Sequence, residues 1–517
     1  MSRKKLPIGV QTFARIREDD CYYVDKTGIA LQLIEEGNYY FLSRPRRFGK
    51  SLFLDTLAEL FEGNEPLFRG LAVHGQWDWS RRFPVIRLSF GGGVIRDAAD
   101  LGTKIDELLG INERRLQVSC TQRDNRGRFA ELIREAERLH GQRAVILVDE
   151  YDKPILDNLT RPEIAREIRD GLRDLYSVIK DSDAHIRFAM LSGVSKFSKV
   201  SLFSGLNNLR DITLSPGYSA ICGYTDEDVD TVFAPELAGL DRDEVRQWYN
   251  GYNWTGTSVY NPFDLLLLFR EREFRPFWFE TGTPTFLVDL LTTRRTFTPD
   301  LERVMALETL LSSFDVDHIP VEALMFQAGY LTIDSVRRLP GQLHMTLRYP
   351  NLEVRSCLNS ALLQAWSDDP ARCGVHMPQL YDRLLANDFQ GLSALFTSFF
   401  ASIPNDWYRN NPIAQYEGYW ASVFYSHFAA LGLDIRLEDA TNRGRIDMAV
   451  LFNSQVYLFE FKVVELAPEG KALQQIRDRG YAEKYRSRGE PIHLIGVEFS
   501  RESRSVVGFE VERDSTH

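Results

Sequence analysis

The stretch 444–462, GRIDMAVLFNSQVYLFEFK, holds two carboxylates and a lysine at a spacing that suits metal-dependent chemistry. Asp447 lies on the first of two short apolar strands that the stretch predicts, and Glu460 and Lys462 lie on the second. Because residues two apart on a strand share a face, Glu460 and Lys462 point the same way. Two nearby carboxylates suit a hard divalent cation such as Mg²⁺. The lysine would orient or help to deprotonate a water molecule, or stabilise charge developing on a phosphate.

This arrangement depends on the register of the hairpin. If Asn453 and Ser454 form a two-residue turn, counting outward brings Asp447 opposite Glu460, with Cβ atoms roughly 5 Å apart. A three-residue turn would send Asp447 to the other face. The alternative interpretation is an ordinary hairpin with charges on its solvated face. Apolar residues flank the charges on both faces, which predicts a buried pair of strands, and carboxylates buried there need a partner or a metal. A predicted helix follows over 470–486, and its polar face can add Gln475.

A second candidate site follows the predicted strand 38–43, NYYFLS, where the chain reads RPRRFGKS and then continues as an amphipathic helix. Strand, Gly-Lys-Ser and helix in this order are the context of a phosphate-binding loop, in which backbone N–H groups cradle phosphates, the lysine reaches the outer phosphates and the serine hydroxyl holds Mg²⁺. The full pattern has glycine six residues before the lysine, where this chain has Arg44. The predicted nucleotide-binding residues are Arg46, Arg47, Phe48, Gly49, Lys50, Ser51 and Leu52.

The run AVILVDE, residues 144–150, predicts a buried parallel strand with two carboxylates at its carboxyl end. Asp149 would hold Mg²⁺, directly or through water, and Glu150 would polarise the attacking water. The alternative is a core strand that ends at a polar loop. The next predicted strand is 187–192, RFAMLS.

Other polar residues near these strands are weaker candidates. Ser192, or the nearby Ser195 and Lys196, could sense the outer phosphate. Arg210 could stabilise developing charge, or it could form an ordinary salt bridge.

Composition limits the class of protein. The chain has 517 residues, 44% hydrophobic and 26% charged, which predicts a soluble protein of two to four domains. No apolar run approaches the length of a membrane span, and no signal peptide is expected. Five scattered cysteines argue against a disulfide framework or a zinc cluster and favour the cytoplasm. Since the net charge is −11, any nucleic-acid contact must be a local basic patch.

Four sequence motifs together resemble the bacterial and archaeal AAA-ATPase-like family. They are YYVDKT (22–27), RPRRFGKSLFLDTL (44–57), ILVDEYDKP (146–154) and LSGVSKFSKVSLFSGLNNLRDIT (191–213). The resemblance covers most of the chain. It implies that arginine at position 44 is usual, that ATP is the nucleotide, and that a PD-(D/E)XK nuclease domain follows at the C-terminus. The motifs WYNGY (248–252) and VYNPF (259–263) also occur in the family, and we expect their aromatic residues to pack a lid rather than to catalyse.

The same resemblance organises the last part of the chain. A PD-(D/E)XK core has the order helix, three strands, helix, strand, and segments from a helix over 411–431 to a strand over 493–499 supply that order. The resemblance assigns Asp447, Glu460 and Lys462 to the metal and catalytic positions, Gln475 as an auxiliary residue, and Glu417 as a carboxylate near the metal. The signature reads Ile-Asp here rather than Pro-Asp. A basic cluster could contact a phosphate backbone, or it could be a solvated helix face balanced by Asp478 and Glu483. Its members are Arg477, Arg479, Lys484, Arg486 and Arg488.

The predicted fold is therefore α/β and multidomain. We expect a P-loop NTPase domain over 1–230, a mostly helical lid or winged-helix-like region over 231–345, a helical connector over 346–400 and a restriction-endonuclease-like nuclease domain over 401–517. The predicted function is an ATP-binding and ATP-hydrolysing protein coupled to a Mg²⁺-dependent nuclease, with nucleic acid, DNA rather than RNA, as partner, no membrane, and possible homo-oligomers. The alternative is an ATP-switched protein that binds DNA or a partner through a non-cleaving nuclease-like domain.

Overall fold

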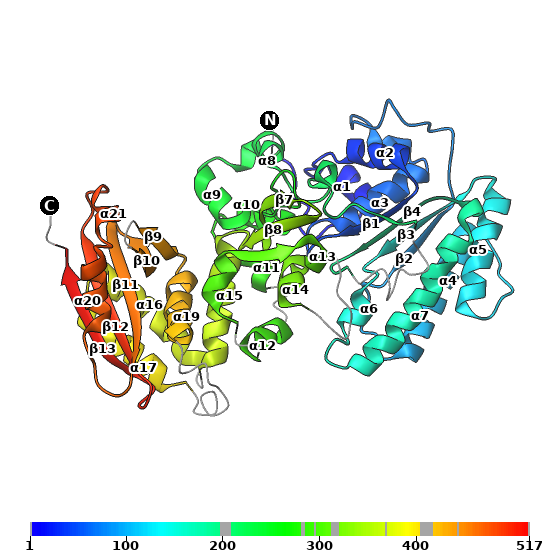
Figure 1. Ribbon diagram of the computed structural model, residues 1–517. Coiled ribbons are helices and arrows are strands. Elements are labelled where there is room, and N and C mark those ends of the chain that lie inside the picture. The colour runs from blue at the N-terminus through cyan, green and yellow to red at the C-terminus, as the bar shows by residue number, and fades with distance from the viewer. Residues whose placement is uncertain are drawn as a thin grey trace. The chain divides into compact units, whose positions relative to one another are not determined.

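The computed structural model describes residues 3–196, 208–280, 285–293, 296–311, 320–367, 370–403, 417–441 and 444–514 (Figure 1). The chain forms two compact units. The first contains Met1–Trp278 and Val304–Asn351, and the second contains Phe279–Arg303 and Leu352–His517. The four-part division expected from the sequence stays a prediction. Within the described residues, no helix is long and apolar enough to cross a membrane.

A five-stranded parallel sheet organises the first unit. Its order is β2-β3-β4-β1-β5, and every neighbouring pair is parallel. The strands are β1 (Tyr39–Ser43), β2 (Val85–Ser89), β3 (Ala144–Asp149), β4 (Ile186–Gly193) and β5 (Arg210–Asp211). β1, β3 and β4 confirm the strands predicted from the sequence. Because parallel strands end at one edge, the segments that follow β1, β3 and β4 meet there.

Helices cover both faces of this sheet. The described helices around it are α1 (Phe13–Glu18), α2 (Thr27–Glu36), α3 (Lys50–Phe61), α4 (Ala98–Leu116), α5 (Asn125–His140), α6 (Lys153–Leu156) and α7 (Pro162–Asp181). Residues of α4, α5 and α7 share one buried apolar cluster with Ile86, Ile146 and Leu191 of the sheet, whereas α3 contacts β3 and β4 (Figure 1). Burial on both faces explains why the strands read as continuous apolar runs.

A helical region and a small sheet complete the first unit. The helices are α8 (Asp226–Val232), α9 (Arg242–Tyr249), α10 (Pro262–Glu271), α13 (Glu308–Leu311) and α14 (Val321–Ala328). The short helix α11 (Phe277–Glu280) includes the boundary between Trp278 and Phe279. The sheet is antiparallel, in the order β6-β8-β7, with β6 (Val304–Leu307), β7 (Thr332–Leu339) and β8 (Gln342–Arg348). Within the region expected to be helical or winged-helix-like, α14 ends at Ala328 and β7 begins at Thr332.

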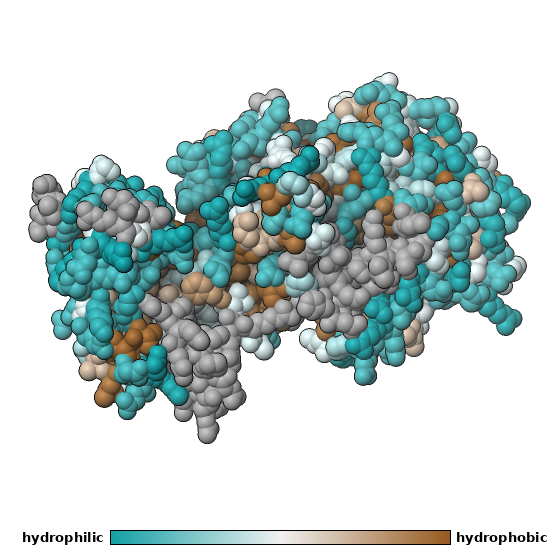
Figure 2. All heavy atoms as spheres, in the orientation of Figure 1, coloured by the Kyte–Doolittle hydropathy of each residue, from teal (hydrophilic) through white to brown (hydrophobic). Residues whose placement is uncertain are grey.

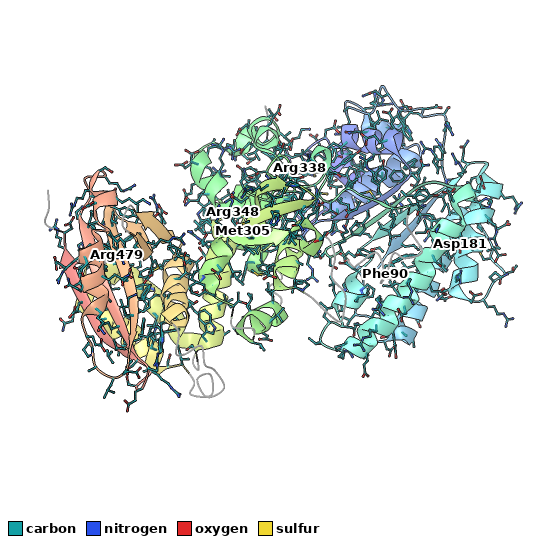
Figure 3. The ribbon with its side chains drawn as sticks, viewed as in Figure 1. Phe90, Asp181, Met305, Arg338, Arg348 and Arg479 are labelled. Carbon is teal, nitrogen blue, oxygen red and sulfur yellow. The ribbon has the colours of Figure 1, made fainter. Side chains whose placement is uncertain are left out.

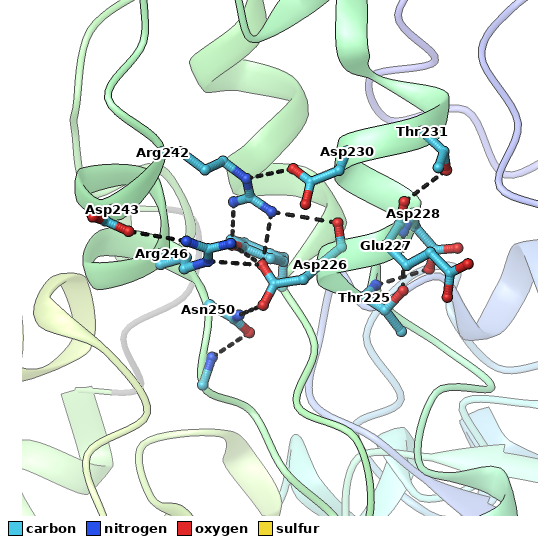
Figure 4. A network of polar contacts seen from close by, with 12 residues as sticks. Thr225, Asp226, Glu227, Asp228, Asp230, Thr231, Arg242, Asp243, Arg246 and Asn250 are labelled. Carbon is cyan, nitrogen blue, oxygen red and sulfur yellow. Dashed lines mark hydrogen bonds and ion pairs between the residues drawn. The ribbon is translucent and has the colours of Figure 1, made fainter.

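Asp226 joins the helices of this region. Its carboxylate accepts hydrogen bonds from the Tyr260 hydroxyl (2.8 Å), from Arg242 Nη2 (2.7 Å) and from Arg246 Nε (3.2 Å) (Figure 4). Thr225 and Asp228 cap α8 reciprocally, which satisfies free N–H groups at its start. Since Lys26 pairs with Asp228 at 2.9 Å, the YYVDKT motif is tied to the same region.

The second unit is built around a mixed five-stranded sheet of order β13-β12-β11-β10-β9, in which β11 and β12 are parallel and the other pairs antiparallel. The strands are β9 (Asp434–Thr441), β10 (Gly444–Phe452), β11 (Gln455–Val464), β12 (Ile492–Ser500) and β13 (Val506–Arg513). The described helices are α12 (Thr285–Thr293), α15 (Leu352–Trp366), α16 (Pro370–Ala386), α17 (Phe389–Ala401), α19 (Glu417–Ala430), α20 (Lys471–Arg479) and α21 (Glu483–Arg486).

Two helix predictions in this unit meet different outcomes. The single helix expected over 470–486 is wrong, because Gly480, at φ 56°, ends α20 before α21 begins at Glu483. The helix expected over 411–431 is present from Glu417 to Ala430, and residues 411–416 lie outside the described residues.

Five 3₁₀ turns are also described in the two units: Glu65–Phe68, Asp183–His185, Pro216–Tyr218, Ala234–Glu236 and Thr298–Glu302.

Candidate active sites

The loop between β1 and α3 is anchored by Arg44. This side chain is fully buried, and its guanidinium donates to the backbone carbonyls of Ser43 (2.8 Å), Thr213 (3.0 Å) and Tyr218 (3.0 Å). It also lies 4.0 Å above the ring of Trp254. Burial lowers the pKa of Arg44 to about 10. The arginine thus holds the start of the loop in place where the common pattern has glycine.

Lys50 lies in the first turn of α3 and points back into the same loop. Its Nζ donates to the carbonyls of Arg44 (2.9 Å) and Pro45 (2.8 Å). Gly49, at φ 90°, makes the left-handed turn that starts the helix. Burial lowers the pKa of Lys50, and the carboxylates of Asp149 and two neighbouring acids oppose that shift. The lysine therefore lies within the electrostatic field of the carboxylates that follow β3.

The remaining predicted loop residues differ in exposure. Arg46 and Arg47 are exposed, whereas Phe48 is buried. The Arg47 guanidinium lies 4.7 Å from the ring of Phe263. Ser51 and Leu52 are half-buried in the first turn of α3. Arg46 and Arg47 are thus presented at the surface, whereas the hydroxyl of Ser51 follows the buried Lys50 in sequence.

The end of β3 carries the two predicted carboxylates. Asp149 Oδ1 accepts hydrogen bonds from Ser192 Oγ (2.7 Å), at the end of β4, and from the Glu150 backbone N–H (3.0 Å). Glu150 has a positive φ of 52°, unusual for a residue with a side chain. Burial and then the Asp149 carboxylate raise the pKa of Glu150. The sheet topology therefore brings the Lys50 loop, Asp149, Glu150 and Ser192 to one edge.

Asp152 is a polar residue of this edge that the sequence reasoning missed. It is 1% exposed, and its carboxylate accepts hydrogen bonds from the backbone N–H groups of Val194 (3.1 Å) and Ser195 (2.6 Å) and from the Ser195 hydroxyl. In the sequence, Asp152 is the second aspartate of DEYD, and this extra carboxylate close after the strand was the feature that could have indicated it. Asp152 couples the segment after β3 to the segment after β4.

The other residues considered near β4 and β5 are engaged elsewhere. Lys196 pairs with Asp211, and its backbone N–H donates to Gln327 Oε1 (2.9 Å). Arg210 pairs with Glu36 at 2.8 Å, which agrees with the ordinary salt bridge expected as the alternative.

Tyr252 of the WYNGY segment and two tryptophans that follow it in the chain, Trp254 and Trp278, contact the loop. The ring of Phe48 meets Tyr252 and Trp254 edge-on, with centroids 4.7 and 5.5 Å apart. Trp278 Nε1 donates to the Arg46 carbonyl at 3.2 Å. Tyr249, Tyr252 and Tyr260 are buried. These contacts support the packing role expected for the two aromatic motifs, and they give the loop a fixed wall.

In the second unit, the hairpin of β10 and β11 has the predicted register. Asn453 and Ser454 form the turn, both with positive φ (50° and 55°), and Phe452 faces Gln455. Positive φ at both turn residues is the geometry of a type I′ hairpin. The paired residues run to Met448 opposite Phe459. One step further, Asp447 Oδ2 accepts a hydrogen bond from the Phe461 backbone N–H (2.9 Å).

Glu460 is the buried centre of this second site. Its side chain is 1% exposed, and its Oε1 accepts hydrogen bonds from Lys462 Nζ (3.3 Å) and from the Gln475 amide. Its Oε2 is buried with no hydrogen-bond partner among the described residues. Burial, and then the Asp447 carboxylate, raises the pKa of Glu460, and Lys462 opposes the shift. The structure thus brings four of the predicted residues together: Asp447, Glu460, Lys462 and Gln475.

Gln475 lies near Tyr481, a residue of the turn between α20 and α21. Burial raises the pKa of the Tyr481 hydroxyl, and a hydrogen bond with Gln475 opposes that shift. A Cβ at Gly444 would lie 3.0 Å from the Tyr481 hydroxyl, and Gly444 has φ 155°. Glycine therefore leaves room for the tyrosine beside the site. Glu417 begins α19, but its side chain lies outside the described residues.

Comparison with known proteins finds a family match for each of two separate parts of the chain. A model of the predicted AAA-ATPase family matches residues 7–203, and a model of the PD-(D/E)XK nuclease superfamily matches residues 415–509. The chain is also 76% identical over 513 residues, 99% of each chain, to "Uncharacterized protein in vnfD 5'region" of Azotobacter chroococcum mcd 1. The chain belongs to the predicted AAA-ATPase family, with a C-terminal PD-(D/E)XK domain. No solved structure matches it.

Membership of these two families implies use of a nucleotide and of a divalent metal. The donor set of the PD-(D/E)XK domain fits a hard cation, because Glu460 Oε2 is a buried oxygen without a partner among the described residues and the Asp447 carboxylate raises the pKa of Glu460. Among those residues, no three His, Cys, Asp or Glu side chains form a metal-binding group. Glu417, the further carboxylate predicted near the metal, has its side chain outside these residues.

Most of the basic cluster of the PD-(D/E)XK domain is used in ion pairs with acidic residues of the same domain. Arg477 pairs with Glu512, Lys484 with Asp439, Arg486 with Asp514 (2.9 Å) and Arg488 with Glu490 (2.5 Å). These four partners lie elsewhere in the sequence than Asp478 and Glu483, and Glu483 also acts electrostatically on Arg486. The pairing favours the alternative of a balanced, solvated face over a phosphate-binding surface.

Proposed function

We propose that this protein binds and hydrolyses ATP in its first unit and uses that cycle to control Mg²⁺-dependent cleavage of nucleic-acid phosphodiester bonds, in DNA rather than RNA, by its PD-(D/E)XK domain. The observation that carries the nuclease proposal is the buried carboxylate of Glu460. It has one oxygen held by Lys462 and Gln475 and the other without a partner among the described residues. Because a buried carboxylate oxygen without a hydrogen-bond partner is unfavourable, a bound cation would supply the interaction that this oxygen lacks.

The ATP site has a clear division of roles. Backbone N–H groups of the loop from Arg46 to Gly49 and the start of α3 would bind phosphates, and Lys50 would exchange its carbonyl partners for phosphate oxygens. Ser51 and Asp149 would hold Mg²⁺. Glu150 would accept a proton from the attacking water, a role that its raised pKa suits. Asp152 would keep the segment after β4 in register with these groups.

In the nuclease site, Asp447 and Glu460 would hold the cation. When bound, Mg²⁺ would lower the pKa of a water molecule and offset charge on the leaving oxygen. Lys462, which is 25% exposed, would orient the water and stabilise charge on the scissile phosphate. Gln475 would fix the rotamer of Glu460 through its amide hydrogen bond.

The test is cleavage of single- and double-stranded DNA and RNA with Mg²⁺, with and without ATP. We expect cleavage by the wild-type protein, its loss in Lys462→Ala, and its retention in the control Lys471→Ala, an exposed lysine of the same domain. Equal activity of Lys462→Ala and wild type would refute the assignment.

The ATPase assignment has a separate test. Glu150→Gln should bind ATP with near wild-type affinity and hydrolyse it at least 100-fold more slowly, because the variant lacks the proton acceptor. Hydrolysis by Glu150→Gln at the wild-type rate would contradict the role of this carboxylate.

A second candidate function is an ATP-switched binding protein whose nuclease-like domain does not cleave. The observation that favours it is that only two carboxylates, Asp447 and Glu460, meet at the site within the described residues. Nucleic-acid binding with no cleavage in any metal would support this candidate.

A further inference from the structure

The strands β7 and β8 form a hairpin whose outer part is highly exposed. β7 is an edge strand of the small sheet, and its residues Asp334 to Arg338 are all exposed. Arg337 pairs in register with His344, and Arg338 pairs with Leu343 near the turn. Figure 3 shows Arg338 and Arg348 at different ends of this hairpin. Figure 2 shows the whole molecule in the same orientation, with hydrophilic residues over most of the surface and smaller hydrophobic patches among them.

The charge of this hairpin is positive in a chain that is negative overall. Residues 332–348 contain three arginines and one acid, Asp334, whereas the whole chain has a net charge of −11. Asp334 pairs with Arg348 at 3.0 Å, at the base of the hairpin. Within the described residues, Arg337 and Arg338 form no ion pair and no side-chain hydrogen bond. Because consecutive strand residues point to opposite faces, the two guanidinium groups leave the ribbon on opposite sides.

The nuclease domain itself lacks such free cations in its basic cluster. Four of the five residues in that cluster pair with acids of their own domain. Recruiting them to a phosphate backbone would first break those pairs. A nucleic-acid substrate therefore needs cationic contacts elsewhere in the chain, an argument that rests on the proposed nuclease function.

We propose that the β7–β8 hairpin is a DNA-binding surface, with Arg337 and Arg338 contacting phosphates on the two sides of a groove. A two-stranded β-ribbon has the width that the major groove admits. Arginines on its opposite faces then meet the two phosphate walls, and both contacts gain from release of counterions. The surface contributes affinity without reading sequence, since phosphate contacts carry no base information.

The test measures binding of a fluorescent DNA duplex to the full-length protein by fluorescence anisotropy. The buffer contains EDTA, so that no metal-dependent cleavage occurs. We expect Arg337→Ala/Arg338→Ala to weaken binding on the order of tenfold and to reduce the slope of log K against log salt by about 2. The control is Arg114→Ala/Arg123→Ala, which removes two exposed arginines of the same unit that also have no ion pair among the described residues. The control should bind as wild type does.

The outcomes separate this proposal from the nuclease proposal. If the hairpin variant binds and is cut as the control is, while cleavage still depends on Lys462, the hairpin proposal is wrong and the nuclease stands. If no variant cleaves but binding still depends on the two arginines, the nuclease proposal fails and the hairpin stands. If the double substitution changes only the oligomeric state in sedimentation, the surface binds a second copy of the chain, and the DNA proposal is overturned.

Discussion

The ammonium group of Lys50 lies 2.9 Å from the backbone carbonyl oxygen of Arg44 and donates a hydrogen bond to it. The lysine thus donates its hydrogen bonds to carbonyl oxygens of its own loop. To bind a triphosphate, it would have to donate to phosphate oxygens instead. Arg44 is itself fixed by three carbonyl oxygens and by Trp254. We therefore expect any rearrangement on nucleotide binding to occur between Pro45 and Gly49, beyond the anchored arginine.

Lys50→Ala should lose nucleotide binding. The lysine would otherwise form charge-assisted hydrogen bonds to phosphate, which contribute up to about 3 kcal/mol each, so we expect affinity for ATP to fall about 100-fold or more. Isothermal titration calorimetry measures this, with Lys180→Ala, an exposed lysine of the same unit, as control. Tight ATP binding by Lys50→Ala would refute the assignment of the loop.

Gly251→Ala should disrupt the aromatic wall of the loop. A Cβ at Gly251 would lie 1.9 Å from the Pro350 carbonyl oxygen, and the residue has φ 114°. We expect a loss of roughly 3 kcal/mol or more in unfolding free energy. We also expect weaker ATP binding, because Tyr252 and Trp254, which come shortly after Gly251 in the chain, pack against Phe48 of the loop. The control is Gly239→Ala, which shares a positive φ of 79° but has its nearest contact at 3.8 Å. Equal thermal stability of the two variants would show that the Pro350 contact is unimportant.

The sequence predicted the parts of the molecule that local pattern determines. The buried runs of β1, β3 and β4 and the Asn453-Ser454 turn each carry their signal within a few residues, so the positions of Lys50, Asp149 and Glu460 followed. The role of Arg44 did not follow, because two of its carbonyl partners, Thr213 and Tyr218, lie 169 and 174 residues away in the chain. Such partners are brought together only by the tertiary fold.

The same limit applies to charges in the last domain. The basic residues after Lys471 have acidic neighbours in sequence, Asp478 and Glu483, but Arg477 and Arg486 pair with Glu512 and Asp514 near the end of the chain. The break at Gly480 was visible as a glycine, yet glycine is tolerated in a helix interior at a cost of only about 1 kcal/mol. The continuous helical pattern on both sides therefore predicted one helix where there are two.

Gln475→Ala should slow nucleic-acid cleavage without unfolding the domain. The amide of Gln475 donates to the Glu460 carboxylate, and loss of a group that orients a metal ligand typically costs 10- to 100-fold in activity or metal affinity. We expect a cleavage rate lower by about that factor, with a higher Mg²⁺ concentration at half-maximal rate. The control Gln474→Ala removes a neighbour that bonds the exposed Asp478 instead, at 2.7 Å. A rate for Gln475→Ala equal to that of the control would remove Gln475 from the site.

His427 should make the stability of the second unit depend on pH. Its Nδ1 donates to the Val423 carbonyl (2.8 Å), its Nε2 is buried without a partner among the described residues, and the rings of Phe396 and Phe399 lie against it. Burial lowers the pKa of His427 from 6.5 to about 4. Between these values the unfolded chain binds a proton that the folded protein excludes, so stability falls as pH drops from 6.5 toward 4.

Urea denaturation of wild type and His427→Leu at pH 7 and pH 5 tests this. We expect the wild type to lose about 2 kcal/mol of unfolding free energy between the two pH values beyond any loss in the variant, since each pKa unit contributes about 1.4 kcal/mol. The control His140→Leu changes an exposed histidine on α5 and should keep the wild-type pH dependence. If His427→Leu shows the same pH dependence as wild type, His427 is not the group that destabilises the fold in acid.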